Sequence, residues 1–293
     1  MSIELLIEKR THDLGGGFVV GRVLPFRKRR MMGPFIFWDH LGPLTLEAGI
    51  PRELDVRPHP HIGLSTVTYL YSGAITHRDS LGFEQEIRPG AVNWMTAGKG
   101  ITHSERLEYA RAHGADMHGI QAWVALPDDK EQMDPMFQHH AASALPTWES
   151  DGVQGRLIAG EIDGLTAPAT TYSPMFFQHL NMQEGARHSL PPTYSERAVY
   201  LTSGQVQVDG QPLAPGQMAV LSAGKAVTIT ATTPSVVMLL GGEPIGERFM
   251  LWNFVSSSKD TLRAAAHDWQ AGRMKLPDAD HQEWIPMPEG WSV

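Results

Sequence analysis

Short apolar runs rich in alternating or β-branched residues recur along the whole chain, and turn residues separate them. In the first half these runs occupy 34–38, 65–71, 84–87, 91–96 and 120–126. In the second half they occupy 155–159, 175–180, 198–202, 205–208, 218–221, 227–230 and 236–240. An apolar period of two is typical of a strand with one buried face. The pattern therefore predicts an all-β protein of many short strands, with Asp209-Gly210 as a hairpin turn.

The apolar period becomes that of a helix near the end of the chain. Ser258 is a suitable N-cap, and Gly272 stands where such a helix would end. The apolar stripe between them consists of Leu262, Ala265, Ala266 and Trp269. We therefore expect a helix over 259–272. The Pro-rich tail over 276–293 carries Trp284 and Trp291, which suggest that it docks on the body of the protein.

Two segments of the chain resemble each other. RPGAVNWMTAGKG at 88–100 and APGQMAVLSAGKA at 214–226 share a Pro-Gly turn, a strand and an Ala-Gly-Lys ending. Duplication of one β-barrel explains this repeat, and chance similarity of two strand–turn segments is the alternative. We expect an N-terminal domain over 1–134, a linker over 135–149 and a C-terminal domain over 150–293 that carries the helix.

Composition narrows the chemistry of the chain. The 293 residues include no cysteine, which excludes disulfides, thiolate metal sites and cysteine catalysis. A net charge of −8 argues against binding of nucleic acids or anionic membranes, and the basic run at 27–30 reads as a solvated face. The first residues contain no apolar core of signal-peptide length, and no run approaches the roughly 20 apolar residues of a membrane span. The expected location is the cytoplasm.

Two short pairs carry the candidate chemistry, His59-x-His61 and His103-x-Glu105. Their alternate spacing puts both side chains of a pair on one face of a strand. Three imidazoles and one carboxylate suit Fe(II), Mn(II), Ni(II), Cu(II) or Zn(II), and they leave two positions of a six-coordinate metal open. A single His-x-His in a chain with 14 histidines arises easily by chance, but two pairs in a β context are a stronger signal. Two interpretations are open for His77, Arg78 and Asp79: they border the mouth of a pocket, or, as we expect, they form a hydrogen-bonded loop.

Four segments of the chain resemble the pirin family of bicupins. They are RVLPFRKRRMMGPFIFWDHLGP at 22–43, RPHPHIGLSTVTYLYSGAITHRDSLG at 57–82, VNWMTAGKGITHSE at 92–105 and LWNFVSSSKDTLRAAAHDWQAGRM at 251–274. The resemblance implies two tandem cupin domains, jelly-roll-like antiparallel β-barrels packed face to face, followed by a C-terminal helix and tail. It also implies a metal, usually iron, in the N-terminal barrel only.

The family's metal ligands match four positions of this chain: His59, His61, His103 and Glu105. The second half contains His179 and His188 but no His-x-His pair, in line with a second barrel that has lost its ligands. Many family members have a Glu where this chain has Ser65, which strengthens Glu105 as the carboxylate ligand. The implied cofactor is one divalent transition metal, Fe(II) first, with Mn, Ni, Cu and Zn as alternatives.

The resemblance implies a quercetin 2,3-dioxygenase-type activity on flavonol-like aromatic compounds. Glu105 would then be catalytic, taking the proton of the substrate hydroxyl. The alternative is a non-enzymatic iron-binding regulator that binds a transcription factor or a metabolic enzyme. A third interpretation is a structural metal, whose removal would unfold the protein. The expected partners are a small phenolic substrate and, for the regulator, a protein, and we expect a monomer.

Overall fold

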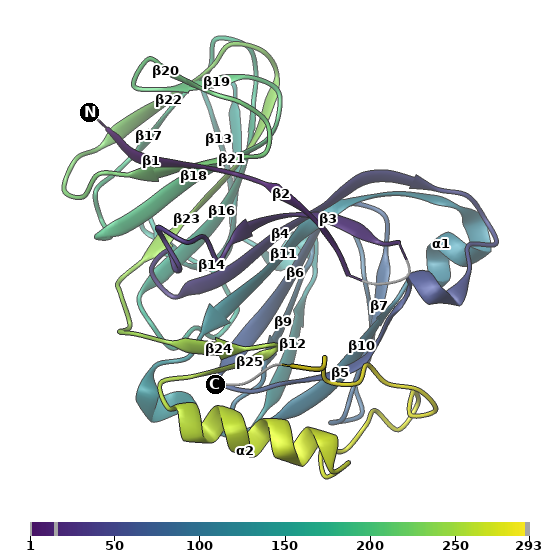
Figure 1. The fold of residues 1–293 in the computed structure, drawn as a ribbon. Coiled ribbons are helices and arrows are strands. Elements are labelled where there is room, and N and C mark those ends of the chain that lie inside the picture. Colours follow the sequence, from purple (N-terminus) through teal and green to yellow (C-terminus); the bar gives the residue numbers. More distant parts are fainter. Residues whose placement is uncertain (1, 15–16, 291–293) are drawn as a thin grey trace. The chain divides into compact units, whose positions relative to one another are not determined.

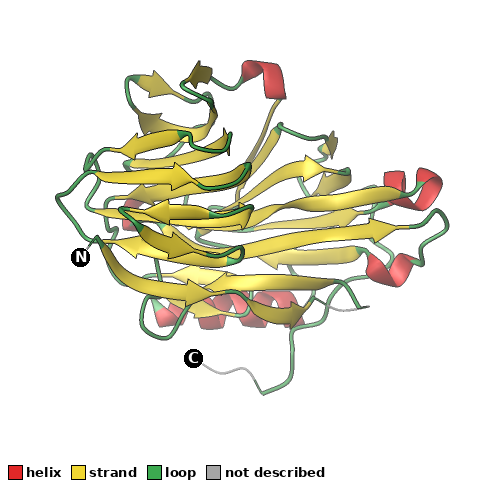
Figure 2. Ribbon diagram, turned by 90° about the horizontal axis from the view of Figure 1, so that it is seen from above, coloured by secondary structure: helices red, strands yellow, loops and turns green. Residues whose placement is uncertain are grey.

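The computed structural model describes residues 2–14 and 17–290, and most of its ribbon is strand (Figure 2). This confirms the all-β prediction with two cupin domains. The described residues form two compact units. Unit 1 draws on Met1–Thr11, Gly21–His40 and His140–Ile245, and unit 2 draws on His12–Val20, Leu41–His139 and Gly246–Val293. The consecutive domain boundaries expected from the sequence remain a prediction, whereas these compact units combine segments that are distant along the chain.

Unit 2 contains a four-stranded antiparallel sheet that carries both candidate ligand pairs. Its order is β5 (Val56–His61), β10 (Ile101–Arg106), β7 (Ile75–Asp79) and β8 (Glu84–Ile87). A seven-stranded sheet runs β12 (Met136–His140), β9 (Val92–Thr96), β6 (Leu64–Ser72), β11 (Ala115–Ala125), β4 (Phe35–Leu46), β3 (Val19–Leu24) and β2 (Arg10–Asp13). Strand β12 lies inside the predicted linker over 135–149, and it pairs with β9 at the edge of this sheet.

Unit 1 repeats this plan. Its four-stranded sheet runs β17 (Arg187–Leu190), β22 (Val227–Ala231), β19 (Val206–Val208) and β20 (Gln211–Leu213). Its larger sheet runs β1 (Ile3–Glu8), β21 (Gln217–Leu221), β18 (Glu196–Ser203), β23 (Ser235–Gly242), β16 (Met175–Met182), β14 (Val153–Ile162) and β13 (Thr147–Ser150), with β15 (Leu165–Thr166) beside β14. The repeated segments of the sequence supply β9 in one unit and β21 in the other. Asp209 and Gly210, both with positive φ, join β19 to β20 as predicted.

The interior of unit 1 is a large apolar cluster drawn from both of its sheets. Phe176, Leu201 and Leu239 are among its fully buried members. Burial of such side chains is the main favourable term in folding. Unit 2 has a smaller apolar cluster around Leu70 and Ile87, while polar side chains occupy much of the space between its sheets.

Helix α2 (Lys259–Gln270) follows the two-stranded sheet of β24 (Phe249–Leu251) and β25 (Phe254–Ser256), and it lies beside these strands in unit 2 (Figure 1). Ser258 caps it by accepting the backbone N–H of Thr261. All four residues of the predicted stripe are buried, which confirms the helix, although it ends at Gln270 rather than at 272. The other α-helix among the described residues is α1 (Glu108–His113). No helix of the described residues has the length and apolar character needed to cross a membrane.

The tail after α2 docks on unit 2, but not through Trp284, one of the two tryptophans expected to hold it. Trp284 is 52% exposed, and Trp291 lies outside the described residues. Instead, the backbone N–H of Ile285 donates to the carbonyl of Pro58, and its carbonyl accepts from the Trp269 indole. Polar contacts from Asp280 and Glu283 complete the docking.

Candidate metal centre

Strands β5 and β10 bring three histidines to one point. Their register pairs His103 with His59 and Ile101 with His61, so the three imidazoles share one face of the sheet. The ring centroids lie 4.4 to 5.1 Å apart, and one ring nitrogen from each ring lies within 4.8 Å of the other two. The exposed fractions of His59, His61 and His103 are 6%, 1% and 1%. Pro58 and Pro60 place β5 at the sheet edge, where their missing N–H groups cost no ladder bond.

Hydrogen bonds fix the orientation of two of these imidazoles. The Nδ1 of His59 lies 2.9 Å from the carbonyl of Arg57, and the Nδ1 of His61 lies 3.1 Å from the carbonyl of Asn253. A carbonyl only accepts, so each Nδ1 carries the proton and each Nε2 keeps its lone pair. Burial lowers the pKa of His59 to about 4 and that of His61 well below its usual value. Both rings are therefore neutral near pH 7, the form that binds a metal.

His103 shows most directly that the cluster suits a metal. Its buried Nε2 has no hydrogen-bond partner among the described residues. Burial and the neighbouring His59 and His61 hold its pKa well below the usual value. An orphaned lone pair is costly in a protein interior, and a metal ion would satisfy it. Three neutral imidazoles form a donor set for a divalent transition metal.

Glu105 lies on the same strand as His103 but outside the group of three. A register shift between His103 and Glu105 pairs Glu105 with Val56, and such a bulge re-aims the side chain that follows it. The Oε1 of Glu105 accepts a hydrogen bond of 3.3 Å from Thr68, and its side chain is only half-buried. Burial raises the pKa of Glu105, although nearby His77 and the hydrogen bonds from Thr68 and Gln121 oppose the shift. Its place in the ligand set remains a prediction.

His77 and Asp79 belong to the centre, and the loop expected for them is wrong. They lie on strand β7, alternate with Arg78, and are 4% and 1% exposed. The Nδ1 of His77 is within hydrogen-bond distance of His103, and the Nε2 of His77 is within hydrogen-bond distance of Asp79. The missed signal was their spacing, since His77-x-Asp79 repeats the alternation of the two ligand pairs.

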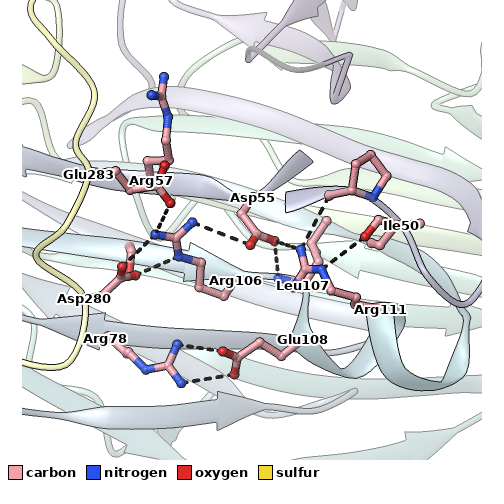
Figure 3. Close-up of polar contacts among 12 residues, drawn as sticks. Ile50, Asp55, Arg57, Arg78, Arg106, Leu107, Glu108, Arg111, Asp280 and Glu283 are labelled. Atoms are coloured by element: carbon pink, nitrogen blue, oxygen red, sulfur yellow. Dashed lines mark hydrogen bonds and ion pairs between the residues drawn. The ribbon is translucent and has the colours of Figure 1, made fainter. Parts of the chain in front are cut away.

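The back of the ligand strand is covered by the C-terminal tail. Thr102, Ser104 and Arg106 alternate with the inward side chains of β10 and are at most 1% exposed. Thr102 donates to the carbonyl of Lys275, and Asp280 accepts from both Ser104 and Arg106. Figure 3 shows Arg106 held between Asp280 and Glu283 on one side and Asp55 on the other. These contacts bring residues 280 and 104 together, and no local sequence pattern could predict them.

Aromatic side chains adjoin the cluster on two sides. Trp123 of β11 packs edge-on against His61, with ring centroids 5.0 Å apart. Phe137 of β12 stacks on His77 at 4.3 Å. Ser65 is bonded to Thr96 and lies on the opposite face of β6 from Thr68. A carboxylate at position 65 would therefore point away from the cluster, so Ser65 has no bearing on Glu105.

His179 and His188 of unit 1 do not form a second cluster. Among the described residues, the group of His, Cys, Asp or Glu ligand atoms able to hold a metal consists of the three histidines of unit 2. His179 is buried, which lowers its pKa to about 4, and His188 stacks on Trp148. That the second barrel has lost its ligands stays a prediction.

Comparison with known proteins covers nearly the whole chain. A family model described as Pirin matches residues 17–124, and one described as Pirin C-terminal cupin domain matches residues 177–275. The chain is 56% identical over 288 residues to a pirin-like protein of Caulobacter vibrioides, covering 98% of this chain and 100% of the relative. It is 39% identical to a Pseudomonas aeruginosa protein provisionally named a quercetin 2,3-dioxygenase, covering 94% of this chain and 87% of that protein.

A solved structure supports the same grouping. The crystal structure of quercetin 2,3-dioxygenase from Acinetobacter baumannii superposes with a TM-score of 0.89 at 36% sequence identity. The match covers 97% of this chain and 94% of that one. Fold and sequence therefore agree over both units.

Proposed function

Because this chain belongs to the pirin family, we propose that it is a metal-dependent dioxygenase that opens the ring of flavonol-like aromatic compounds, of the quercetin 2,3-dioxygenase type. The reaction takes up O2, cleaves the heterocycle and releases carbon monoxide. The relative and the solved structure that carry this activity in their names support the proposal.

The observation that carries the proposal is the group of three buried imidazoles with converging ring nitrogens. His59, His61 and His103 would hold one divalent metal, with Fe(II) as the proposed ion and Mn, Ni, Cu or Zn as alternatives. Such a metal supplies a Lewis acid that favours the deprotonated form of a phenolic hydroxyl.

The chain's own side chains would bind and deprotonate the substrate. Glu105 is the half-buried carboxylate of the inner face, so its Oε1 or Oε2 is the proposed acceptor of the hydroxyl proton. Thr68 and Gln121 orient this carboxylate through hydrogen bonds. The rings of Trp123 and Phe137 make the surroundings of the cluster apolar and aromatic, which suits an aromatic substrate.

The test is O2 uptake and carbon monoxide release with quercetin, after loading the protein separately with Fe(II), Mn(II), Ni(II), Co(II) or Cu(II). We expect turnover with at least one metal and its loss in His59→Ala. His188→Ala is the matched control, because it removes a buried histidine from the corresponding strand of unit 1, and it should keep full turnover.

Absence of turnover with every metal would overturn the dioxygenase proposal. If the protein nevertheless binds iron tightly, that result would favour the regulatory alternative. Glu105→Gln provides a second readout, since it should bind metal but lose turnover at every pH at which the substrate hydroxyl remains protonated.

A further inference from the structure

Strand β7 brings a second pair of polar side chains against the three-histidine cluster. Its register places Asp79 opposite His103 and His77 opposite Glu105. The alternate residue Arg78 points the other way and pairs with Glu84 and Glu108, as Figure 3 shows for Glu108. His77 and Asp79 therefore share the inward face of the sheet with the candidate ligands.

A chain of hydrogen bonds runs from His103 through His77 to Asp79. The Nδ1 atoms of His103 and His77 are 3.3 Å apart, and the Nε2 of His77 lies 2.9 Å from Oδ2 of Asp79. The other oxygen of Asp79, Oδ1, accepts the backbone N–H groups of Leu81 and Phe83 at 2.9 and 3.1 Å. Asp79 is thus held as an acceptor on both oxygens.

The donors and acceptors along this chain of hydrogen bonds determine the tautomer of His103. Asp79 accepts, so Nε2 of His77 donates to it, and in the tautomer with its proton on Nε2 the Nδ1 of His77 accepts from Nδ1 of His103. The proton between the two rings then belongs to Nδ1 of His103. Nε2 of His103 is left with its lone pair, and this is the buried atom without a hydrogen-bond partner among the described residues. This chain of hydrogen bonds therefore favours the tautomer of His103 whose Nε2 is free to bind a metal.

The three imidazoles are therefore supported differently. His59 and His61 each donate to a backbone carbonyl, which is a neutral dipole. His103 donates to a histidine that is itself bonded to a buried carboxylate. Partners of this kind orient a metal-bound imidazole and raise its basicity. The stack of Phe137 on His77, with ring planes 12° apart, holds the intermediate ring in place.

We propose that His77 and Asp79 are positioning residues that hold His103 as an Nε2 ligand and make it a stronger donor than His59 or His61. The inference rests on the metal centre of the proposed function but not on its substrate. It assigns no contact with substrate to His77 or Asp79.

The experiment measures binding of Co(II) to the full-length protein by competition with a chromophoric chelator, together with the visible absorption spectrum of the bound ion. In His77→Leu we expect the Kd to rise by about 10- to 100-fold and the absorption bands to shift. Asp79→Asn should change both in the same direction by a smaller amount. His77→Asn should recover much of the affinity, because its Oδ1 can accept from Nδ1 of His103.

Arg78→Gln is the matched control on the same strand, and it should retain the wild-type Kd and spectrum. The inference is overturned if His77→Leu binds Co(II) with the wild-type Kd and spectrum. It is also overturned if Arg78→Gln weakens binding as much as His77→Leu, since strand stability would then explain both. A wild-type protein that binds no Co(II), Fe(II) or Ni(II) would overturn the metal centre itself, and with it the inference.

Discussion

Units 1 and 2 build their four-stranded sheets in the same order, yet the inward positions of the two sheets carry opposite chemistry. In unit 2 His103 pairs with His59, and in unit 1 Ile229 pairs with His188. Two residues further along the edge strand, His61 pairs with Ile101 in unit 2, and Leu190 pairs with Val227 in unit 1. His59, His61 and His103 thus correspond to His188, Leu190 and Ile229.

This correspondence shows that the barrel architecture alone does not make a metal site. Unit 1 keeps one histidine of the three, and its interior is filled by apolar side chains. A lone buried imidazole cannot coordinate a metal by itself, so His188 packs on Trp148 instead. The chemistry of each unit is decided by a few inward side chains on two strands.

The outward faces of the same strands differ as well. On β10 the outward residues Thr102 and Ser104 are buried under the C-terminal tail. On β22 the corresponding Thr228 and Thr230 are half-exposed. The ligand-bearing strand is thus supported on both faces, which limits its movement and favours a preorganised site.

The largest expected effect follows from giving unit 2 the side chain of unit 1. His103→Ile should weaken divalent-metal binding by more than about 100-fold, because loss of an outer partner alone costs about 10- to 100-fold. The free energy of unfolding of the metal-free variant should stay within about 2 kcal/mol of the wild-type value. The substitution removes the unsatisfied Nε2 of His103, which is favourable, and this offsets the cost of leaving Nδ1 of His77 without its partner. Metal titration and urea unfolding measure the two quantities. Retained metal affinity would contradict the ligand assignment, and His188→Ile is the control that should leave it intact.

The reverse exchange should destabilise the protein rather than create a site. Ile229→His places an imidazole in the apolar interior of unit 1, where Val206 and Val208 occupy the register positions of His77 and Asp79. Lost apolar burial and an unsatisfied polar group together should cost about 2–5 kcal/mol, a large part of a typical stability of about 5–15 kcal/mol. The midpoint of urea unfolding reports this loss. Ile229→Val should cost only about 0.5–1.5 kcal/mol, and similar values for both variants would show that the polar group is tolerated.

The sequence predicted what depends on local alternation. The spacing within the two pairs, His59-x-His61 and His103-x-Glu105, and their β-rich flanks selected the three histidines. The cap at Ser258 and the apolar stripe that follows it predicted α2. His77 and Asp79 were missed because the turn residues around them suggested a loop, although their own spacing was that of a strand.

Other parts of the centre lie beyond any local pattern. The carbonyl that holds His61 comes from Asn253, at the other end of the chain. Gly63 permits this approach, because a Cβ there would lie 2.0 Å from the carbonyl oxygen of Val255. The polar docking of the tail depends in the same way on tertiary contacts of Arg106. Such contacts are set by the folded barrel, so hydrophobic periodicity carries no signal for them.

The smallest expected effect tests the outward face of the ligand strand. Burial alone would raise the pKa of Asp280, but hydrogen bonds from Arg106 and Ser104 outweigh it and hold that pKa below its usual value near 3.8. A carboxyl whose pKa is lower in the folded state adds stability above its unfolded pKa and loses that contribution as the pH falls through the folded pKa. Asp280→Asn should therefore cost about 1–3 kcal/mol at pH 7, since Glu283 and Asp55 still partner Arg106.

The same variant should differ less from the wild type at pH 3, because this pH lies below the usual pKa of an aspartate in the unfolded chain and the wild type has lost part of the contribution from its ionised carboxyl. Urea unfolding at the two pH values measures both differences. Asp278→Asn is the matched control, because its pair with Lys275 is largely exposed and should contribute at most about 1 kcal/mol. An Asp280→Asn cost that stays equal at pH 7 and pH 3 would show that packing of the tail, rather than the ion pair with Arg106, supports the back of the ligand strand.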